Sequence, residues 1–188
     1  MNIIIQATVV LLLTPWLAGA QPATNAPAAP AEASPVTFQE IRVTSASPSS
    51  AGPAWGKILL DFEVRDAWLD GLQFAVKALV GDGTPAKPFS VLMGNVRYFN
   101  IPQGKNSAVL YVSPNTLKRF GGLNAVQADI YFQDRVAGTK SWFGGKGPKP
   151  PENWGNQFQQ KSGALLPISA TPWVSIEYDK YPDLLLGR

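Results

Sequence analysis

Short segments in which apolar and polar residues alternate constrain the fold of this chain most strongly. The clearest one, at residues 57–65, places four apolar residues on one face: Ile58, Leu60, Phe62 and Val64. A period of two is the spacing of a β-strand that buries one face. Similar segments occupy residues 36–43, 72–80 and 126–132, with Gly-, Pro- or Ser-rich turns between them. The pattern predicts an all-β, antiparallel β-sandwich, with an immunoglobulin-like arrangement as its leading version.

The segments between these strands predict the remaining elements. Residues 113–120 are expected to form one short helix, because Ser113 suits its N-cap, Pro114 its first position and Gly121 its left-handed end. We expect a strand over 89–101 that is bent or interrupted at Gly94, then a hairpin turn at 103–106. A further strand is expected at 140–143, and a last one within residues 165–178, before Tyr181.

Residues 1–20 resemble a cleavable secretory signal. Their apolar run is shorter than the roughly 20 residues that span a bilayer, and Ala18-Gly19-Ala20 provides small residues for signal peptidase. No basic residue precedes this run, so an uncut membrane anchor is the alternative. Residues 21–35 are rich in alanine and proline and predict a disordered tether. Residues 36–188 would then form the β-sandwich domain of an exported protein in the periplasm, at the outer membrane or outside the cell.

Composition excludes several classes of site. The chain contains no cysteine and no histidine, so imidazole and thiolate metal sites, lipidation and histidine-based catalysis are all ruled out. Asp66 with Asp70, or Asp82 in its glycine turn, are the places for a calcium ion, but neither matches a calcium-binding loop, so turn formation is expected instead. Asp61 and Glu63 are expected on an exposed strand face rather than across a cleft. We therefore expect no enzyme, no cofactor and no metal.

Basic residues are concentrated in one part of the chain. Between residues 105 and 161 there are eight basic residues and three acidic ones. Such a surface could meet an anionic glycan, a lipid headgroup or an acidic partner, or simply remain solvated. Export makes nucleic acid an unsuitable partner.

Aromatic residues beside the long loop at 144–160 give the candidate binding site. Strand or helix periodicity does not account for these aromatics, and lysines lie near them. Flat rings with nearby lysines can stack on sugars or anchor a protein interface. The alternative is that the rings seal an open edge of the sandwich. The candidate residues are Trp142, Phe143, Lys146, Lys149, Trp154 and Phe158. The strand at 140–143 could also accept a partner strand, whereas Trp55, Trp68 and Trp173 are expected in the core or at its rim.

The C-terminal residues carry a resemblance to a known family. The run Leu165-Leu166-Pro167-Ile168-Ser169-Ala170-Thr171-Pro172-Trp173, followed by Tyr178-Asp179-Lys180-Tyr181, resembles the signature of a small exported family of mucin-degrading gut bacteria. With the tether and the strand pattern, the chain resembles the immunoglobulin-like family encoded in the type IV pilus-like gene cluster of Akkermansia. The resemblance implies a non-enzymatic protein of the envelope or pilus. The chain lacks the Gly cut site and long apolar helix of a major pilin.

Two functions follow as expectations. The first is an interaction module of a pilus-like assembly or adhesion apparatus, with envelope or pilus-machinery proteins as partners. The second is a carbohydrate-binding module that uses the 142–158 segment, with host or mucin glycans as ligands. The sequence leaves the partner and the oligomeric state open.

Overall fold

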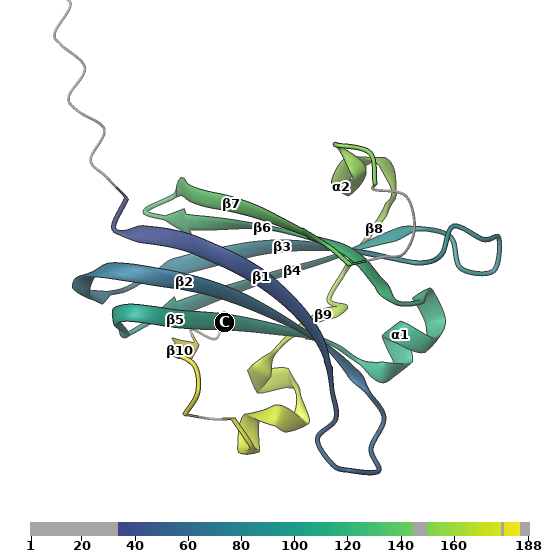
Figure 1. The fold of residues 1–188 in the computed structure, drawn as a ribbon, viewed down its shortest axis with the longest axis horizontal. Helices are drawn as coiled ribbons and strands as arrows, with labels where there is room; N and C mark the ends of the chain where they lie inside the picture. The colour runs from purple at the N-terminus through teal and green to yellow at the C-terminus, as the bar shows by residue number, and fades with distance from the viewer. Residues whose placement is uncertain (1–33, 145–149, 178, 185–188) are drawn as a thin grey trace, which may run out of the picture. The chain divides into compact units, whose positions relative to one another are not determined.

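A computed structural model describes residues 34–144, 150–177 and 179–184 of the chain. The predicted signal at 1–20 and nearly all of the predicted tether at 21–35 lie outside these residues. The described residues form two β-sheets, packed face to face (Figure 1). The predicted all-β sandwich is confirmed.

The first sheet has the strand order β1-β2-β5-β9 and is antiparallel throughout. Its strands are β1 (Val36–Ala46), β2 (Trp55–Leu69), β5 (Ile101–Val112) and β9 (Leu165–Pro167).

The second sheet has the order β10-β4-β3-β6-β7. Its strands are β3 (Leu72–Val80), β4 (Ser90–Phe99), β6 (Leu123–Phe132), β7 (Arg135–Phe143) and β10 (Asp183–Leu184). A short strand, β8 (Gln159–Ser162), pairs in parallel with β4.

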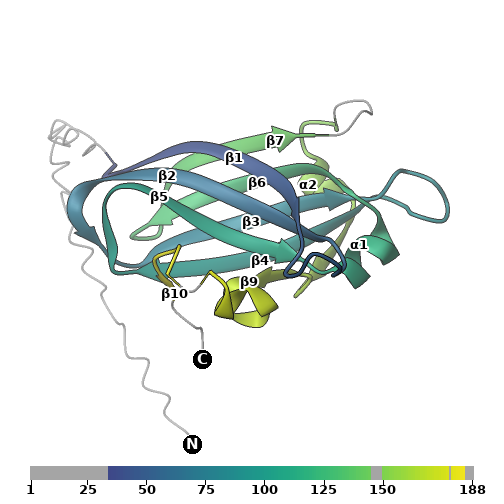
Figure 2. The same ribbon diagram turned by 60° about the horizontal axis from the view of Figure 1, so that its bottom comes forward.

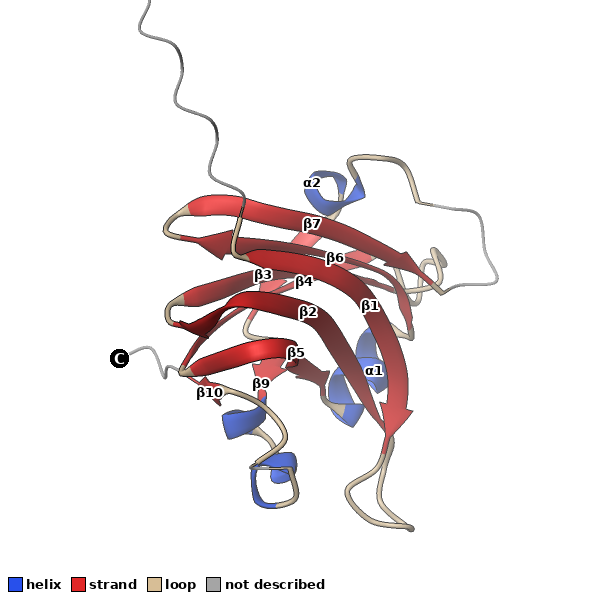
Figure 3. Ribbon diagram, turned by 60° about the vertical axis from the view of Figure 1, so that its left-hand side comes forward, coloured by secondary structure: helices blue, strands red, loops and turns tan. Residues whose placement is uncertain are grey.

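These two orders place β1-β2-β5 in one layer and β4-β3-β6-β7 in the other, and the immunoglobulin-like version of the sandwich stays a prediction. Helix α1 (Pro114–Phe120) connects the two sheets between β5 and β6. It begins as predicted, because the Ser113 side chain accepts a hydrogen bond from the Thr116 N–H. It ends at Gly121, whose φ of 102° is a backbone conformation that favours glycine. Figure 3 shows the helices outside the two sheets.

The core lies between the sheets and is formed by the alternating residues. The predicted inward residues of β2 are buried, and they meet those of β3, β5 and β6. Phe62 from the first sheet contacts Phe74 from the second, with ring centroids 5.1 Å apart. Because no cysteine is present, the packing of these apolar faces holds the sheets together.

Two segments differ from the sequence prediction. The predicted hairpin turn at 103–106 is wrong, because β5 runs through these residues and pairs with β2 instead of folding back on a neighbour. The chain instead turns at Asn100, with φ of 51°, as it crosses from β4 in one sheet to β5 in the other. The predicted interruption at Gly94 is also wrong, since β4 continues through it and pairs with β3 on both sides.

The predicted last strand is confirmed as the short β9 (Leu165–Pro167), and two 3₁₀ turns follow it. They are η1 (Ile168–Ala170) and η2 (Pro172–Ser175), and Figure 2 shows this yellow segment close to β9. Thr171 caps the second turn by accepting the Trp173 N–H, and Pro172 occupies its first position. The long loop at 144–160 contains a short helix, α2 (Trp154–Gln157), and the start of β8, so its described part is not structureless.

Candidate functional site

A buried ion pair fixes the C-terminal segment to the outer face of the first sheet. Lys57 comes from an outward position of β2, and Glu177 follows η2. The Lys57 Nζ lies 2.8 Å and 2.7 Å from the two carboxylate oxygens of Glu177. The two side chains are only 12% and 7% exposed. We call the described residues 168–177 and 179–182 the C-terminal strap.

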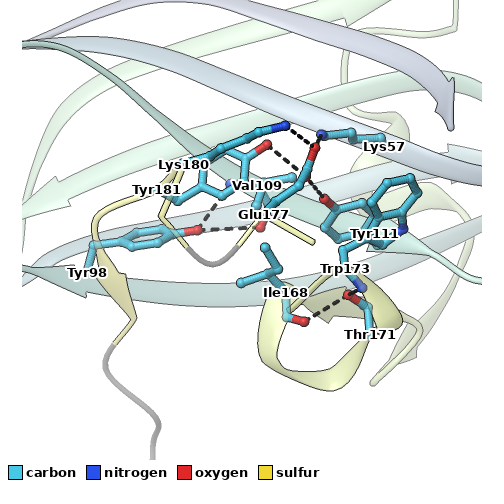
Figure 4. A network of polar contacts seen from close by, with 10 residues as sticks. All are labelled: Lys57, Tyr98, Val109, Tyr111, Ile168, Thr171, Trp173, Glu177, Lys180 and Tyr181. Atoms are coloured by element: carbon cyan, nitrogen blue, oxygen red, sulfur yellow. Dashed lines mark hydrogen bonds and ion pairs between the residues drawn. The ribbon is translucent and has the colours of Figure 1, made fainter. Parts of the chain in front are cut away.

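Aromatic rings enclose this ion pair (Figure 4). Tyr111 of β5 stacks on Trp173 of the strap, with centroids 5.7 Å apart and planes inclined by 11°. The Lys57 ammonium lies 5.6–5.7 Å from the ring centroids of Tyr111, Trp173 and Tyr181. Cation–π attraction at such distances strengthens where water is excluded.

Glu177 accepts hydrogen bonds from three further groups. The Tyr111 hydroxyl donates at 2.7 Å, the Tyr181 hydroxyl at 3.3 Å and the Lys180 ammonium at 3.2 Å. Burial alone would raise the pKa of Glu177, but hydrogen bonds, above all from Lys57 and Tyr111, outweigh it and lower the pKa to about 2. Burial and the neighbouring carboxylate raise the pKa of Tyr181 to about 12. The carboxylate is therefore ionised and saturated, which suits an anchor and not a proton acceptor.

A hollow of about 650 Å³ lies between the strap and the first sheet. Lys180, Tyr181 and Pro182 of the strap form one side, and Trp68 of β2 and Lys105 of β5 line the hollow as well. Because Lys180 and Tyr181 are both hydrogen-bonded to Glu177, the ion pair also fixes the wall of this hollow.

A second hollow, of about 430 Å³, lies beside the first, and both are lined by Lys105, Asn106 and Ser107. We call the two hollows together the outer groove. In the second hollow, Arg42 Nε and Ser107 Oγ each donate to Asp61 at 2.5 Å. Partial burial opposes ionisation, but these two hydrogen bonds lower the pKa of Asp61 below its ordinary value. Such a carboxylate is a poor general acid.

The aromatic site predicted from sequence does not form a single exposed surface. Trp154 is only 2% exposed and packs with Leu79 and Val91 on the outer face of the second sheet. Phe158 is half-buried against the same cluster. These two residues cover the outer face of the second sheet, whereas the alternative from sequence placed them at an open edge of the sandwich.

The other predicted residues lie apart from that cluster. Trp142 is half-buried against the main core, and Phe143 is 45% exposed at the end of the edge strand β7. Lys146 and Lys149 lie outside the described residues. The four of the six predicted residues that the structure describes therefore do not form one site.

Sequence reasoning missed the groove and the ion pair. Lys57 looks like any polar residue on the outer face of a strand, and nothing near Glu177 marks it as buried. The one available signal was the aromatic content of the strap, where Trp173 was expected only as a residue of the core or its rim. Trp68, expected in the core or at its rim, is 67% exposed.

The described residues also bear on metals and membranes. They contain no cluster of three or more side chains that could hold a metal ion. Asp82 performs turn chemistry as expected, since its carboxylate accepts from the backbone N–H and the hydroxyl of Thr84. In the described ranges no helix has the length and apolar character needed to cross a membrane.

Comparison with known proteins places the fold. A family model matches residues 54–185, which is more than half of the chain. A crystal structure of a protein from Akkermansia muciniphila is similar, with a TM-score of 0.67 and 20% identity over 81% of this chain and 94% of that one. No curated protein sequence matches. The predicted likeness to a protein of Akkermansia is confirmed at the level of the fold, whereas the link to a pilus-like gene cluster stays a prediction.

Proposed function

The chain belongs to the family whose model matches residues 54–185, and from this premise we propose that it is a non-enzymatic interaction module. It would be exported and would contribute to a pilus-like assembly or adhesion apparatus at the cell envelope. The signal-like residues 1–20 and the C-terminal resemblance support the location and the apparatus.

The observation that carries the proposal is the outer groove. Its two hollows, of about 650 and 430 Å³, are in the size range of ligand sites, and the exposed indole of Trp68 lines the first. Exposed aromatic side chains next to polar groups are typical of binding surfaces.

The charges of the groove support binding rather than catalysis. Asp61 is held ionised by Arg42 and Ser107, and Glu177 beside the groove is ionised by Lys57. Neither carboxylate can deliver a proton near neutral pH, because each has a lowered pKa.

Photo-crosslinking in intact cells tests the proposal. The crosslinking amino acid p-benzoylphenylalanine replaces Trp68 in the groove or, as a matched control, Val136, which is 58% exposed on β7. We expect adducts with envelope or pilus-machinery proteins from position 68 and not from position 136. The same adducts from both positions, or recovery of the chain in the cytoplasm alone, would contradict the proposal.

Carbohydrate binding through the 142–158 segment is the weaker alternative. Trp154, its central residue, is buried and presents no ring to a ligand. Phe143 is 45% exposed, so a measurement of carbohydrate binding by Phe143→Ala is the test that remains for that segment.

A further inference from the structure

Trp68 is exposed because of an irregularity in β2. The pairing with β5 runs from Val64 opposite Gly104 directly to Trp68 opposite Pro102. Residues 65–67 therefore bulge, and the Gln103 amide stabilises the bulge by donating to the Arg65 carbonyl at 2.7 Å. Bulges of this kind re-aim side chains. Residues 65–68 are all exposed, whereas Leu69 returns to the core.

An exposed tryptophan alone is an ordinary feature of a protein surface. The second observation is that Trp68 lines the 650 Å³ hollow together with Tyr181. The Tyr181 hydroxyl is hydrogen-bonded to Glu177, so one of the two aromatic residues that line the hollow is fixed before a ligand arrives. A rigid wall lowers the entropic cost of binding.

The polar groups that line the hollow are amides, a hydroxyl group, and positive and negative groups whose charges nearly cancel. Asn106 and Ser107 line one side, and Lys105 and Asp179 contribute one positive and one negative charge. The Lys180 ammonium is committed to Glu177. An anionic ligand would need an excess of positive charge, which this hollow lacks.

From this combination we infer that the first hollow binds a neutral saccharide, with one sugar ring stacked on Trp68. A sugar ring offers an apolar C–H face to an indole and a rim of hydroxyl groups that both donate and accept hydrogen bonds. The Lys105 ammonium can donate to that rim, and the Asp179 carboxylate can accept from it. The Asn106 amide N–H groups and the Ser107 hydroxyl are donated within the protein, so these two side chains offer oxygen acceptors to the sugar. The second hollow adjoins the first through Lys105, Asn106 and Ser107, so the groove has room for more than one sugar unit.

This inference rests on the proposed function, since it assigns a ligand to the same groove. The two remain separable, because photo-crosslinking reports protein partners and does not depend on sugar. Adducts with pilus machinery without sugar binding would leave the proposed function intact and overturn the saccharide.

The test titrates the purified chain with lactose, N-acetyllactosamine and cellobiose, and with 3′-sialyllactose as the anionic comparator. Calorimetry gives the affinity, and the indole N–H signal of Trp68 in ¹H–¹⁵N spectra gives the place of binding. We expect saturable binding of at least one neutral sugar. Trp68→Ala should weaken it at least tenfold, whereas Phe143→Ala, the matched exposed aromatic on the other sheet, should leave it unchanged.

Four outcomes would overturn the inference. They are no binding of any neutral sugar at 10 mM, tighter binding of 3′-sialyllactose than of lactose, an equal loss in Phe143→Ala, and perturbation of the Trp68 signal only by a synthetic peptide of residues 21–35. The last result would make the hollow a site for proline-rich peptides instead. Near-ultraviolet circular dichroism checks that both variants keep the fold.

Discussion

Replacing Glu177 with glutamine should destabilise the fold strongly at neutral pH. The substitution keeps the size of the side chain but removes the negative charge beside Lys57, whose side chain is only 12% exposed. Removing one partner of a buried ion pair typically costs about 3–5 kcal/mol, because the other charge stays buried without compensation. The hydroxyls of Tyr111 and Tyr181 would also lose a charged acceptor.

The lowered pKa of Glu177 leads to a similar loss of free energy of unfolding for Glu177→Gln. A pKa that falls from an ordinary 4.5 to about 2 on folding corresponds to about 3 kcal/mol of stability at neutral pH. Because the pKa is lower in the folded state, this contribution is complete above about pH 4.5. It is lost as the pH falls from 4.5 to 2, so the native chain should lose about 2 kcal/mol relative to Glu177→Gln by pH 3.

Urea unfolding at pH 7 and pH 3 measures both effects. We expect the free energy of unfolding of Glu177→Gln to lie about 3 kcal/mol below that of the native chain at pH 7, with the gap narrowing at pH 3. The double variant Lys57→Met with Glu177→Gln is the control and should recover much of the loss, since it leaves no unpaired charge. A gap that is the same at both pH values would refute the reasoning.

Three further substitutions test the fold. Trp154→Ala should cost about 3–5 kcal/mol in urea unfolding without affecting the outer groove, because its ring is buried on the other sheet; a loss under 1 kcal/mol would mean that the ring does not seal that face. Gly94→Ala should lower the free energy of unfolding by about 1–3 kcal/mol, since a Cβ at this position would lie 2.6 Å from the Cβ of Leu165. An unchanged urea midpoint would show that β9 can shift to make room for the methyl group. Ser113→Ala should cost about 1 kcal/mol by removing the cap on Thr116, and Ser113→Asp, which can still cap, should restore it.

Local sequence patterns predict most of the strands of the sandwich. The alternation in β2 and β3 is a direct consequence of burying one strand face, and the bounds of β3 are those predicted, Leu72–Val80. The start of α1 followed from cap chemistry at Ser113, which acts over only three residues.

The errors arise where distant segments decide the structure. Residues 103–106 look like a turn, yet residues 104–106 pair with residues 62–64 of β2. The Asn106 amide supports the irregular backbone there by donating to the carbonyls of Pro102 and Gly104. Gly94 looks like a bend, but its lack of a side chain instead allows Leu165 to approach β4. No local pattern contains either contact.

The candidate site was mislocated for a related reason. Aromatic residues in an irregular segment suggested a binding surface, but exposure depends on what the segment packs against. Trp154 packs on an apolar surface formed by Leu79 and Val91 on the second sheet. The bulge in β2 leaves Trp68 exposed instead of packed on such a surface. The sequence predicts Trp154 at a binding surface and Trp68 in the core or at its rim, and the packing of the two residues reverses that expectation.

The C-terminal residues that carried the family resemblance now have a physical role. Ile168 and Trp173 pack on the first sheet, Thr171 caps η2, and Lys180 and Tyr181 donate to Glu177. Each of these residues holds the strap in place, and the strap forms a wall of the outer groove. The residues that carry the resemblance therefore support the wall of the groove. Trp68, which we propose contacts the ligand, lies outside that run.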